Sequence, residues 1–141
     1  MAVDRARIGY ALPAFDVVAS AERIAQFAQA IGMSAAPDVA PPTFMKAVEG
    51  ENNSSRRILD ALAVDLKRVL HAEQQFDYLA PIRRGDVLRV QRTVTDIYER
   101  KNGQMEFIVI ESSITRVDDG ELAGRSRQIV LVRHPAPKVA A

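Results

Sequence analysis

The chain has 141 residues, of which 48% are apolar and 26% are charged, a composition typical of a globular domain with a real core. Its 19 basic and 18 acidic residues leave a net charge of +1 with no long run of either sign, so nucleic acid and anionic membrane are poor partners. Cysteine is absent and there are only two histidines, which excludes disulfides, thiol catalysis, cysteine-bound metals and a multi-histidine metal site.

The N-terminal part predicts an extended segment followed by a helix. Residues 7–12 read as extended up to Pro13, and residues 15–18 as an edge strand or loop. Ser20 is a good N-cap, and Gly32 is placed to end the helix that it opens. The apolar stripe of this helix has helical spacing and comprises Ile24, Phe27, Ala28 and Ile31. Residues 33–40 are small and irregular and predict a loop.

A short second helix is expected directly after Pro41-Pro42, because proline is accepted where a helix needs no amide donor. Its apolar face carries Phe44, Ala47 and Val48, and Gly50 ends it. Residues 50–55 predict a polar loop in which Ser54 or Ser55 caps a third helix. The apolar side of that helix comprises Ile58, Leu59, Leu62 and Leu66.

From Val69 the apolar period changes from 3.6 to 2, which predicts strands. In the first strand, residues 69–78, we expect one face to be covered by helices and to carry Leu70, Ala72, Gln74, Phe76 and Tyr78. Three further strands span residues 87–98, 105–117 and 122–133, with turn signals at 101–103 and 118–120. The tail from about residue 135 is expected to be loosely ordered.

Helices followed by about four long strands predict an α+β domain, in which an antiparallel sheet curls around the short central helix. No repeat or linker divides the chain, so we expect one domain over residues 1–141. No apolar leader or span of about 18 apolar residues is present, which predicts a cytoplasmic protein without a membrane segment. The edge strands need a cover, and a partner chain is the simplest one.

Three motifs occur in a fixed order between about Ser20 and Arg133. They are Ala40-Pro41-Pro42-Thr43-Phe44, then Leu70-His71-Ala72-Glu73-Gln74-Gln75-Phe76-Asp77-Tyr78 with Pro81 and Gly85-Asp86, and then Tyr98-x-x-Lys101-x-Gly103. Together they resemble the MaoC-like dehydratase/hydratase family, in particular the N-terminal-type hot-dog domain of (R)-specific 3-hydroxyacyl dehydratases. The resemblance implies a hot-dog fold, two such folds side by side, and acyl thioesters of coenzyme A or acyl carrier protein as substrates.

Catalytic members of this family place an Asp and a His about five residues apart before the central helix, where they move protons as water adds to a 2-enoyl thioester. In this chain residues 32–42 contain no histidine, and Asp38 is their only carboxylate. The resemblance therefore implies a non-catalytic subunit without a catalytic residue, cofactor or metal. Its tunnel wall would comprise Pro42, Thr43, Phe44, Met45 and Gln74, and a catalytic MaoC-like partner would supply Asp and His in a heterodimer or heterotetramer.

Two alternatives remain open: a homodimeric hot-dog acyl-CoA thioesterase, and an acyl-thioester-binding module without chemistry. The thioesterase needs a carboxylate over the thioester, for which Asp38 and Glu49 are the candidates. Because Glu49 stands beside Gly50 at a helix end, we expect it to be solvated rather than catalytic. Phe44 and Met45 are favoured as core residues over a ligand wall.

Other polar residues carry weaker signals. His71 is expected to be a surface or interface residue bonded to a nearby carboxylate, rather than a general base, and His134 to be structural. Gln74 should bond either to the backbone of residues 41–43, which we favour, or to the thioester or pantetheine. Six arginines could meet a coenzyme A phosphate or an acidic carrier protein, although scattered surface arginines usually do neither: Arg83, Arg84, Arg89, Arg92, Arg125 and Arg127.

Overall fold

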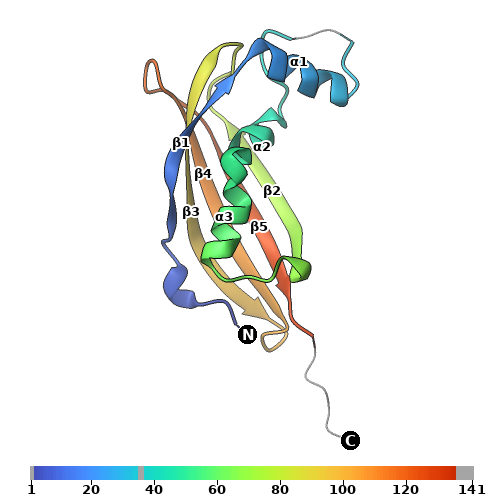
Figure 1. The fold of residues 1–141 in the computed structure, drawn as a ribbon, viewed down its shortest axis with the longest axis vertical. Coiled ribbons are helices and arrows are strands. Elements are labelled where there is room, and N and C mark those ends of the chain that lie inside the picture. The colour runs from blue at the N-terminus through green and yellow to red at the C-terminus, as the bar shows by residue number, and fades with distance from the viewer. Residues whose placement is uncertain (1, 35–36, 136–141) are drawn as a thin grey trace, which may run out of the picture.

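A computed structural model describes residues 2–34 and 37–135, and its framework is one antiparallel sheet (Figure 1). The strand order across the sheet is β1-β3-β4-β5-β2. The strands are β1 (Ala11–Ala19), β2 (Val69–Tyr78), β3 (Asp86–Arg100), β4 (Met105–Arg116) and β5 (Leu122–Arg133). The sheet curls around helices that lie on one of its faces, which confirms the predicted α+β hot-dog architecture (Figure 1). The expected loose tail lies beyond Pro135 and so outside the described residues, apart from Pro135 itself.

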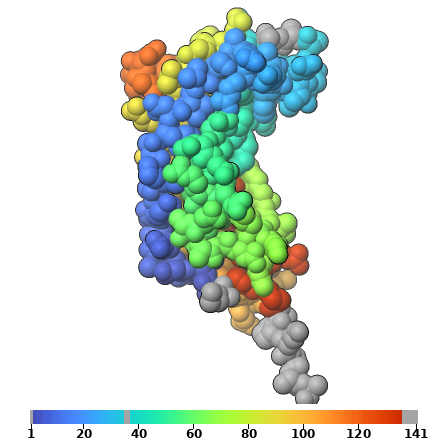
Figure 2. Space-filling model, viewed as in Figure 1, coloured from blue at the N-terminus to red at the C-terminus, as the bar shows by residue number. Residues whose placement is uncertain are grey.

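Within the described residues, three α-helices and three short 3-10 turns connect or cover the strands. They are η1 (Arg5–Arg7), α1 (Ala21–Ala30), α2 (Phe44–Glu49), η2 (Glu51–Asn53), α3 (Ser54–Ala61) and η3 (Leu66–Arg68). The Ser20 side chain accepts a hydrogen bond from the Arg23 amide and caps α1 as predicted. Helix α2 is the central element, with Met45 and Val48 buried in the core cluster that also takes in β3 residues. Helix α3 continues along the sheet beyond α2 and covers a second cluster (Figures 1 and 2).

The first strand is longer than the sequence indicated. Pro13 was expected to stop it, but β1 runs through this residue and pairs with β3 on both sides of it. A register shift lies between Leu12 and Phe15, and β1 is at the edge of the sheet. A missing proline amide is tolerated at an edge or a bulge, so the strand continues.

The start of α3 also differs from the prediction. The N-cap residue is Asn53, which follows Asn52 in the left-handed region at φ values of 54° and 59°. Ser54 is therefore the first helical residue, and its buried hydroxyl donates to the Glu49 carbonyl instead of capping the helix. Leu66 lies beyond α3 in η3 and is partly exposed.

The inward face of β2 changes along the strand. A register shift between His71 and Glu73 reverses the alternation, so Gln74 and Phe76 are partly buried as predicted, whereas Leu70 is 50% exposed. Val69 instead packs against the core on the near side of the shift. The prediction for Leu70 was wrong because a bulge moves every side chain before it to the other face.

Among the residues that the structure describes, no helix is long and apolar enough to cross a membrane.

Candidate functional site

The approach to α2 places the predicted site residues at the boundary between core and surface. Phe44 and Met45 are buried, and the Phe44 ring meets Phe27 edge-on with centroids 5.5 Å apart. Pro42 and Thr43 are exposed, and Thr43 makes no capping bond through its side chain. Pro42 and Thr43 therefore offer surface for contact, whereas Phe44 and Met45 belong to the core, as favoured from the sequence.

The N-terminus of α2 is held by Tyr78 from the end of β2. The Tyr78 hydroxyl donates to the Pro42 carbonyl and accepts a 3.3 Å hydrogen bond from the Met45 amide. Burial raises the pKa of Tyr78, the Met45 hydrogen bond opposes this shift, and the charge of Glu49 adds to it. The Met45 amide, which has no acceptor within the helix, thus has its hydrogen-bond partner in Tyr78 of the same chain.

An apolar groove of about 430 Å³ runs beside Tyr78. Residues 39–42 form one side of the groove and residues 78–82 the other, and the two segments are joined by a 2.7 Å bond from the Ala40 amide to the Ile82 carbonyl. Val39 and Leu79 expose much of their side chains there. The groove is open to solvent and lined mainly by apolar side chains, as is usual for sites that bind apolar groups.

Gln74 does not bond to the backbone of residues 41–43, so the favoured expectation was wrong and Tyr78 takes that role. Its Nε2 donates to Ser126 Oγ at 3.3 Å. Its Oε1 is buried and has no hydrogen-bond partner among the described residues. An unsatisfied buried amide oxygen costs about 1–3 kcal/mol, so this atom is a candidate acceptor for a ligand donor.

Glu49 is fully buried, and the expectation of a solvated acid at the helix end was wrong. Its carboxylate accepts a 3.1 Å bond from Lys46 Nζ and a bond from the Ser126 hydroxyl. Helix α2 turns this residue toward the sheet, where Ser126 of β5 donates to it, while Lys46 of the same helix pairs with its charge. A carboxylate held in this way faces the interior of the chain rather than the groove.

Arg92 is also fully buried, which contradicts its inclusion among possible surface contacts. Its Nε donates to Ser112 at 3.0 Å, and its Nη1 donates to Ser54 and Ser55 at 2.8 Å each. Burial lowers the pKa of Arg92, and the charge of Glu49 opposes this shift. The sequence did hold a signal, because Arg92 alternates with the inward Val90 and Val94.

The other arginines of that set lie at the surface or are half-buried. Arg84 forms an ion pair with Asp38, whose side chain is 77% exposed. Arg89 pairs with Asp16 at 2.9 Å. Arg127 lies 3.6 Å from Glu73 and 3.8 Å from Glu111. Arg83 and Arg125 are exposed, and Arg83 stands beside the groove through its bridge to Val39.

Neither histidine lies at the start of α2. His71 is exposed and its Nε2 is 3.1 Å from the carbonyl oxygen of Glu73, so the expected carboxylate partner was wrong. His134 Nε2 lies 2.6 Å from Glu106 Oε1, which confirms a structural role. Within residues 2–34 and 37–135, no cluster of three metal-ligating side chains occurs.

The curled sheet around α2 defines the hot-dog class of fold, and solved structures share it. The C-terminally truncated HadBC (3R-hydroxyacyl-ACP dehydratase) complex from Mycobacterium tuberculosis has a TM-score of 0.74 at 20% identity, over 93% of this chain and 99% of that one. The ChsH1-ChsH2 complex from the same organism has a TM-score of 0.62 at 16% identity, over 89% and 87%.

Sequence comparisons define the family. A family model described as the FAS1-like dehydratase domain region matches residues 6–124. A UPF0336 protein from Thermobifida fusca is 34% identical over 99 residues, which are 70% of this chain and 63% of that protein, so the chain spans under two thirds of this relative. The chain belongs to the FAS1-like dehydratase domain family and has the MaoC-like hot-dog fold.

Proposed function

We propose that this chain is the non-catalytic subunit of a heteromeric (R)-3-hydroxyacyl-thioester dehydratase. It contributes Pro42, Thr43 and Gln74 to the wall of the substrate tunnel, and Phe44 and Met45 support this wall from the core. A hot-dog partner supplies the Asp and the His that move protons as water leaves or adds to the 2-enoyl thioester.

The start of α2 carries this proposal. Its one preceding carboxylate, Asp38, points to the surface and pairs with Arg84. The Met45 amide, which could otherwise donate to a thioester oxygen, is held by Tyr78 of the same chain. Both histidines are committed elsewhere, to Glu73 and Glu106. General acid–base catalysis of this kind needs a paired Asp and His within reach of the substrate, and the described residues at the start of α2 do not include such a pair.

The open edge of β2 supports the need for a partner. In the described part of the chain β2 pairs only with β5, so its other edge presents unpaired backbone groups. Tyr78 and Leu79 at the end of this strand are exposed beside the groove. A partner that adds its own strand here would cover both the edge and the groove. The HadBC and ChsH1-ChsH2 neighbours are themselves complexes of two different chains.

Reconstitution tests the proposal. Hydration of a 2-enoyl-CoA is measured with this chain alone, with a hot-dog chain of the same genome that carries an Asp and a His before its central helix, and with both. We expect little turnover from this chain alone and strong turnover from the pair. Strong hydration by the purified single chain would refute the proposal.

The thioesterase alternative predicts a different result. It requires Glu49 or Asp38 to act on the thioester, but Glu49 is buried against Ser126 and Lys46 and Asp38 is paired at the surface. Thioester cleavage by the chain alone, abolished by Glu49→Gln or Asp38→Asn, would favour that alternative. Acyl-CoA binding without turnover in any combination would favour the binding module.

A further inference from the structure

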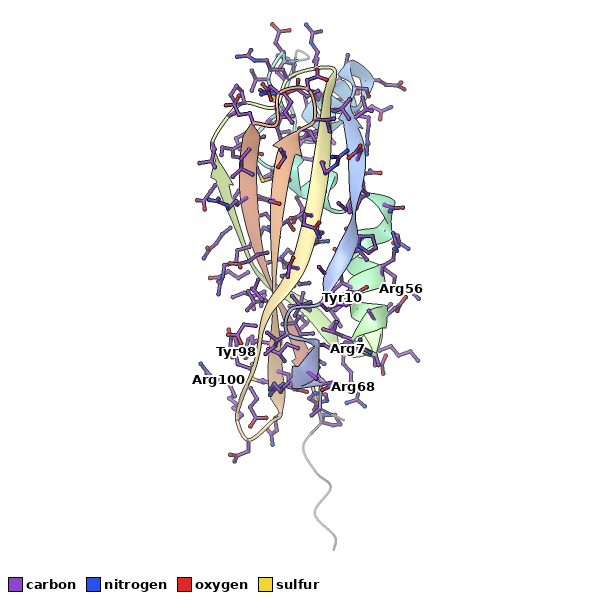
Figure 3. All side chains as sticks on the ribbon, turned by 90° about the vertical axis from the view of Figure 1, so that its left-hand side faces the viewer. Arg7, Tyr10, Arg56, Arg68, Tyr98 and Arg100 are labelled. Carbon is purple, nitrogen blue, oxygen red and sulfur yellow. The ribbon has the colours of Figure 1, made fainter. Side chains whose placement is uncertain are left out.

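The outer face of the sheet has no covering element in the described part of the chain. All three α-helices lie on the opposite face (Figure 1). Figure 3 shows Tyr98 and Arg100 on the side of the sheet away from Arg56 of α3. An uncovered sheet face is ordinarily polar, so apolar side chains on it indicate a contact surface.

An apolar row crosses four strands of this outer face. Tyr98 pairs with Phe107, Phe107 with Leu131, and Leu131 with Leu70. The rings of Tyr98 and Phe107 stack with centroids 5.0 Å apart and an interplanar angle of 14°. Leu70 is 50% exposed, and the other three side chains are partly exposed. The row thus presents an apolar band that crosses these four strands.

Charges of opposite sign flank this row at equal spacing. On β3, Asp96 lies two residues before Tyr98 and Arg100 two residues after it, so all three project from the same face. The Arg100 guanidinium lies 4.8 Å from the centre of the Tyr98 ring. The other end of the row, on β5 and β2, has the same arrangement. Arg133 lies two residues after Leu131 on β5. Glu73 of β2 pairs with Ile129, which lies two residues before Leu131.

We propose that a second copy of this chain packs against this face, with a two-fold axis along the apolar row. Rotation about that axis lays the row on itself and exchanges its two flanks. Arg100 of one copy then meets Asp96 of the other, and Arg133 approaches Glu73. Such a surface is self-complementary, as an isologous contact requires, and two sheets pack in this way about 10 Å apart.

This contact is independent of the β2 edge assigned to the catalytic partner. Leu70 belongs to β2 but projects from the sheet face, whereas the backbone edge of β2 remains open. The two contacts together would assemble two heterodimers back to back. The self-association is therefore expected for this chain alone as well, and its failure would leave the proposed function untouched.

Charge reversal tests the contact. Sedimentation equilibrium on the wild-type chain should show dimers, and Arg100→Asp or Asp96→Arg alone should raise the dissociation constant more than about tenfold, because like charges then face each other. The double variant should restore association, since each interface regains two opposite pairs. A monomeric wild-type chain at high micromolar concentration, or association that none of these changes affects, would overturn the proposal.

Cross-linking gives a second measurement that does not depend on the charged variants. The chain has no cysteine, so Leu131→Cys places a single thiol close to the proposed axis. Ser113→Cys is the matched control, because Ser113 lies six residues along β4 from Phe107 and two copies of it would be on the order of 40 Å apart. Mild oxidation should link the Leu131→Cys chains and leave the Ser113→Cys chains unlinked. Equal linking of both, or of neither, would contradict the arrangement.

Discussion

Arg92 Nη2 donates a 2.6 Å hydrogen bond to Gln128 Oε1 in the buried space between α2 and the sheet. The same guanidinium also bonds to Ser54 and Ser55 at the start of α3. One side chain therefore fixes the sheet to the junction between the two central helices. Ser54 and Gln128 are buried, so loss of Arg92 would remove a hydrogen-bond donor from acceptors that have little access to water.

Replacing Arg92 with methionine should destabilise the chain by about 3–5 kcal/mol, because the buried acceptors lose their donor and the buried Glu49 carboxylate loses a nearby positive charge. Urea unfolding followed by circular dichroism measures the change. Arg89→Met on the same strand is the control, since Arg89 is exposed and should change the midpoint little. Similar midpoints for the two variants would contradict the assigned role.

Glu106 should make the stability depend on acid pH. Burial alone would raise its pKa, but hydrogen bonds from Arg5, the Val3 amide and His134 outweigh burial and hold the pKa below the ordinary value of 4.5. A carboxyl with a lowered folded pKa stabilises the fold fully above its unfolded pKa, and this contribution is lost as the pH falls through the folded pKa.

We therefore expect Glu106→Gln to lower the free energy of unfolding at pH 7 by about 1.5–3 kcal/mol. The variant should also lose less stability than the wild type between pH 5 and pH 3 (about the range in which a carboxyl titrates). Urea midpoints across this range test both points. Glu111→Gln, an exposed change on the same strand, should leave the acid dependence unchanged; an unaltered pH profile for Glu106→Gln would refute the prediction.

Replacing Gly124 with any larger residue should destabilise the fold. A Cβ at this position would lie 2.7 Å from the Asp77 carbonyl oxygen and would overlap the Met45 side chain. We expect Gly124→Ala to cost about 1–3 kcal/mol, because the backbone of β2 cannot move aside as Met45 can. Combining it with Met45→Ala should not remove the clash with Asp77. Thermal unfolding of the single and double variants measures the loss of stability. An unchanged melting temperature for Gly124→Ala would show that the β2 backbone moves to make room for the methyl group.

Gln74→Leu separates a structural role from a binding role. It removes the buried Oε1 that lacks a partner, so the isolated chain should keep its stability within about 1 kcal/mol. In the reconstituted enzyme, kcat/KM should fall by up to about tenfold if this oxygen accepts a substrate donor. Gln75→Leu on the outer face is the control. An unchanged kcat/KM for Gln74→Leu would remove Gln74 from the substrate contacts.

The regular parts of the fold follow from local pattern. Alternation predicts the strands, and the turn at residues 101–103 adopts positive φ at all three positions, as its Asn-Gly sequence indicates. Ser20 caps α1 because a hydroxyl there satisfies a free amide, independently of the rest of the chain. These features need no knowledge of distant residues.

The buried polar residues do not follow from local pattern. Glu49 reads as a surface acid because its partner Ser126 is far away in the sequence. The bulge between His71 and Glu73 has no glycine or proline to mark it, so the reversal at Leu70 is not visible in the sequence. Gln74 and Tyr78 share a face as predicted. Tyr78 reaches Pro42 because its side chain is longer and because it lies at the last position of β2, and the alternation of residues does not indicate this.

The strand order also determines when each part of the sheet can form. Tight hairpins join β3 to β4 and β4 to β5, so these pairings close short loops. In contrast, β1 must pair with β3 across the helical segment, and β2 must pair with β5 across β3 and β4. Long loop closures are slow, and we expect β2 to fold late and its amide hydrogens to exchange with solvent before those of β4. The strand that offers its edge to a partner is thus expected to become ordered late, and binding during synthesis would shield it from aggregation.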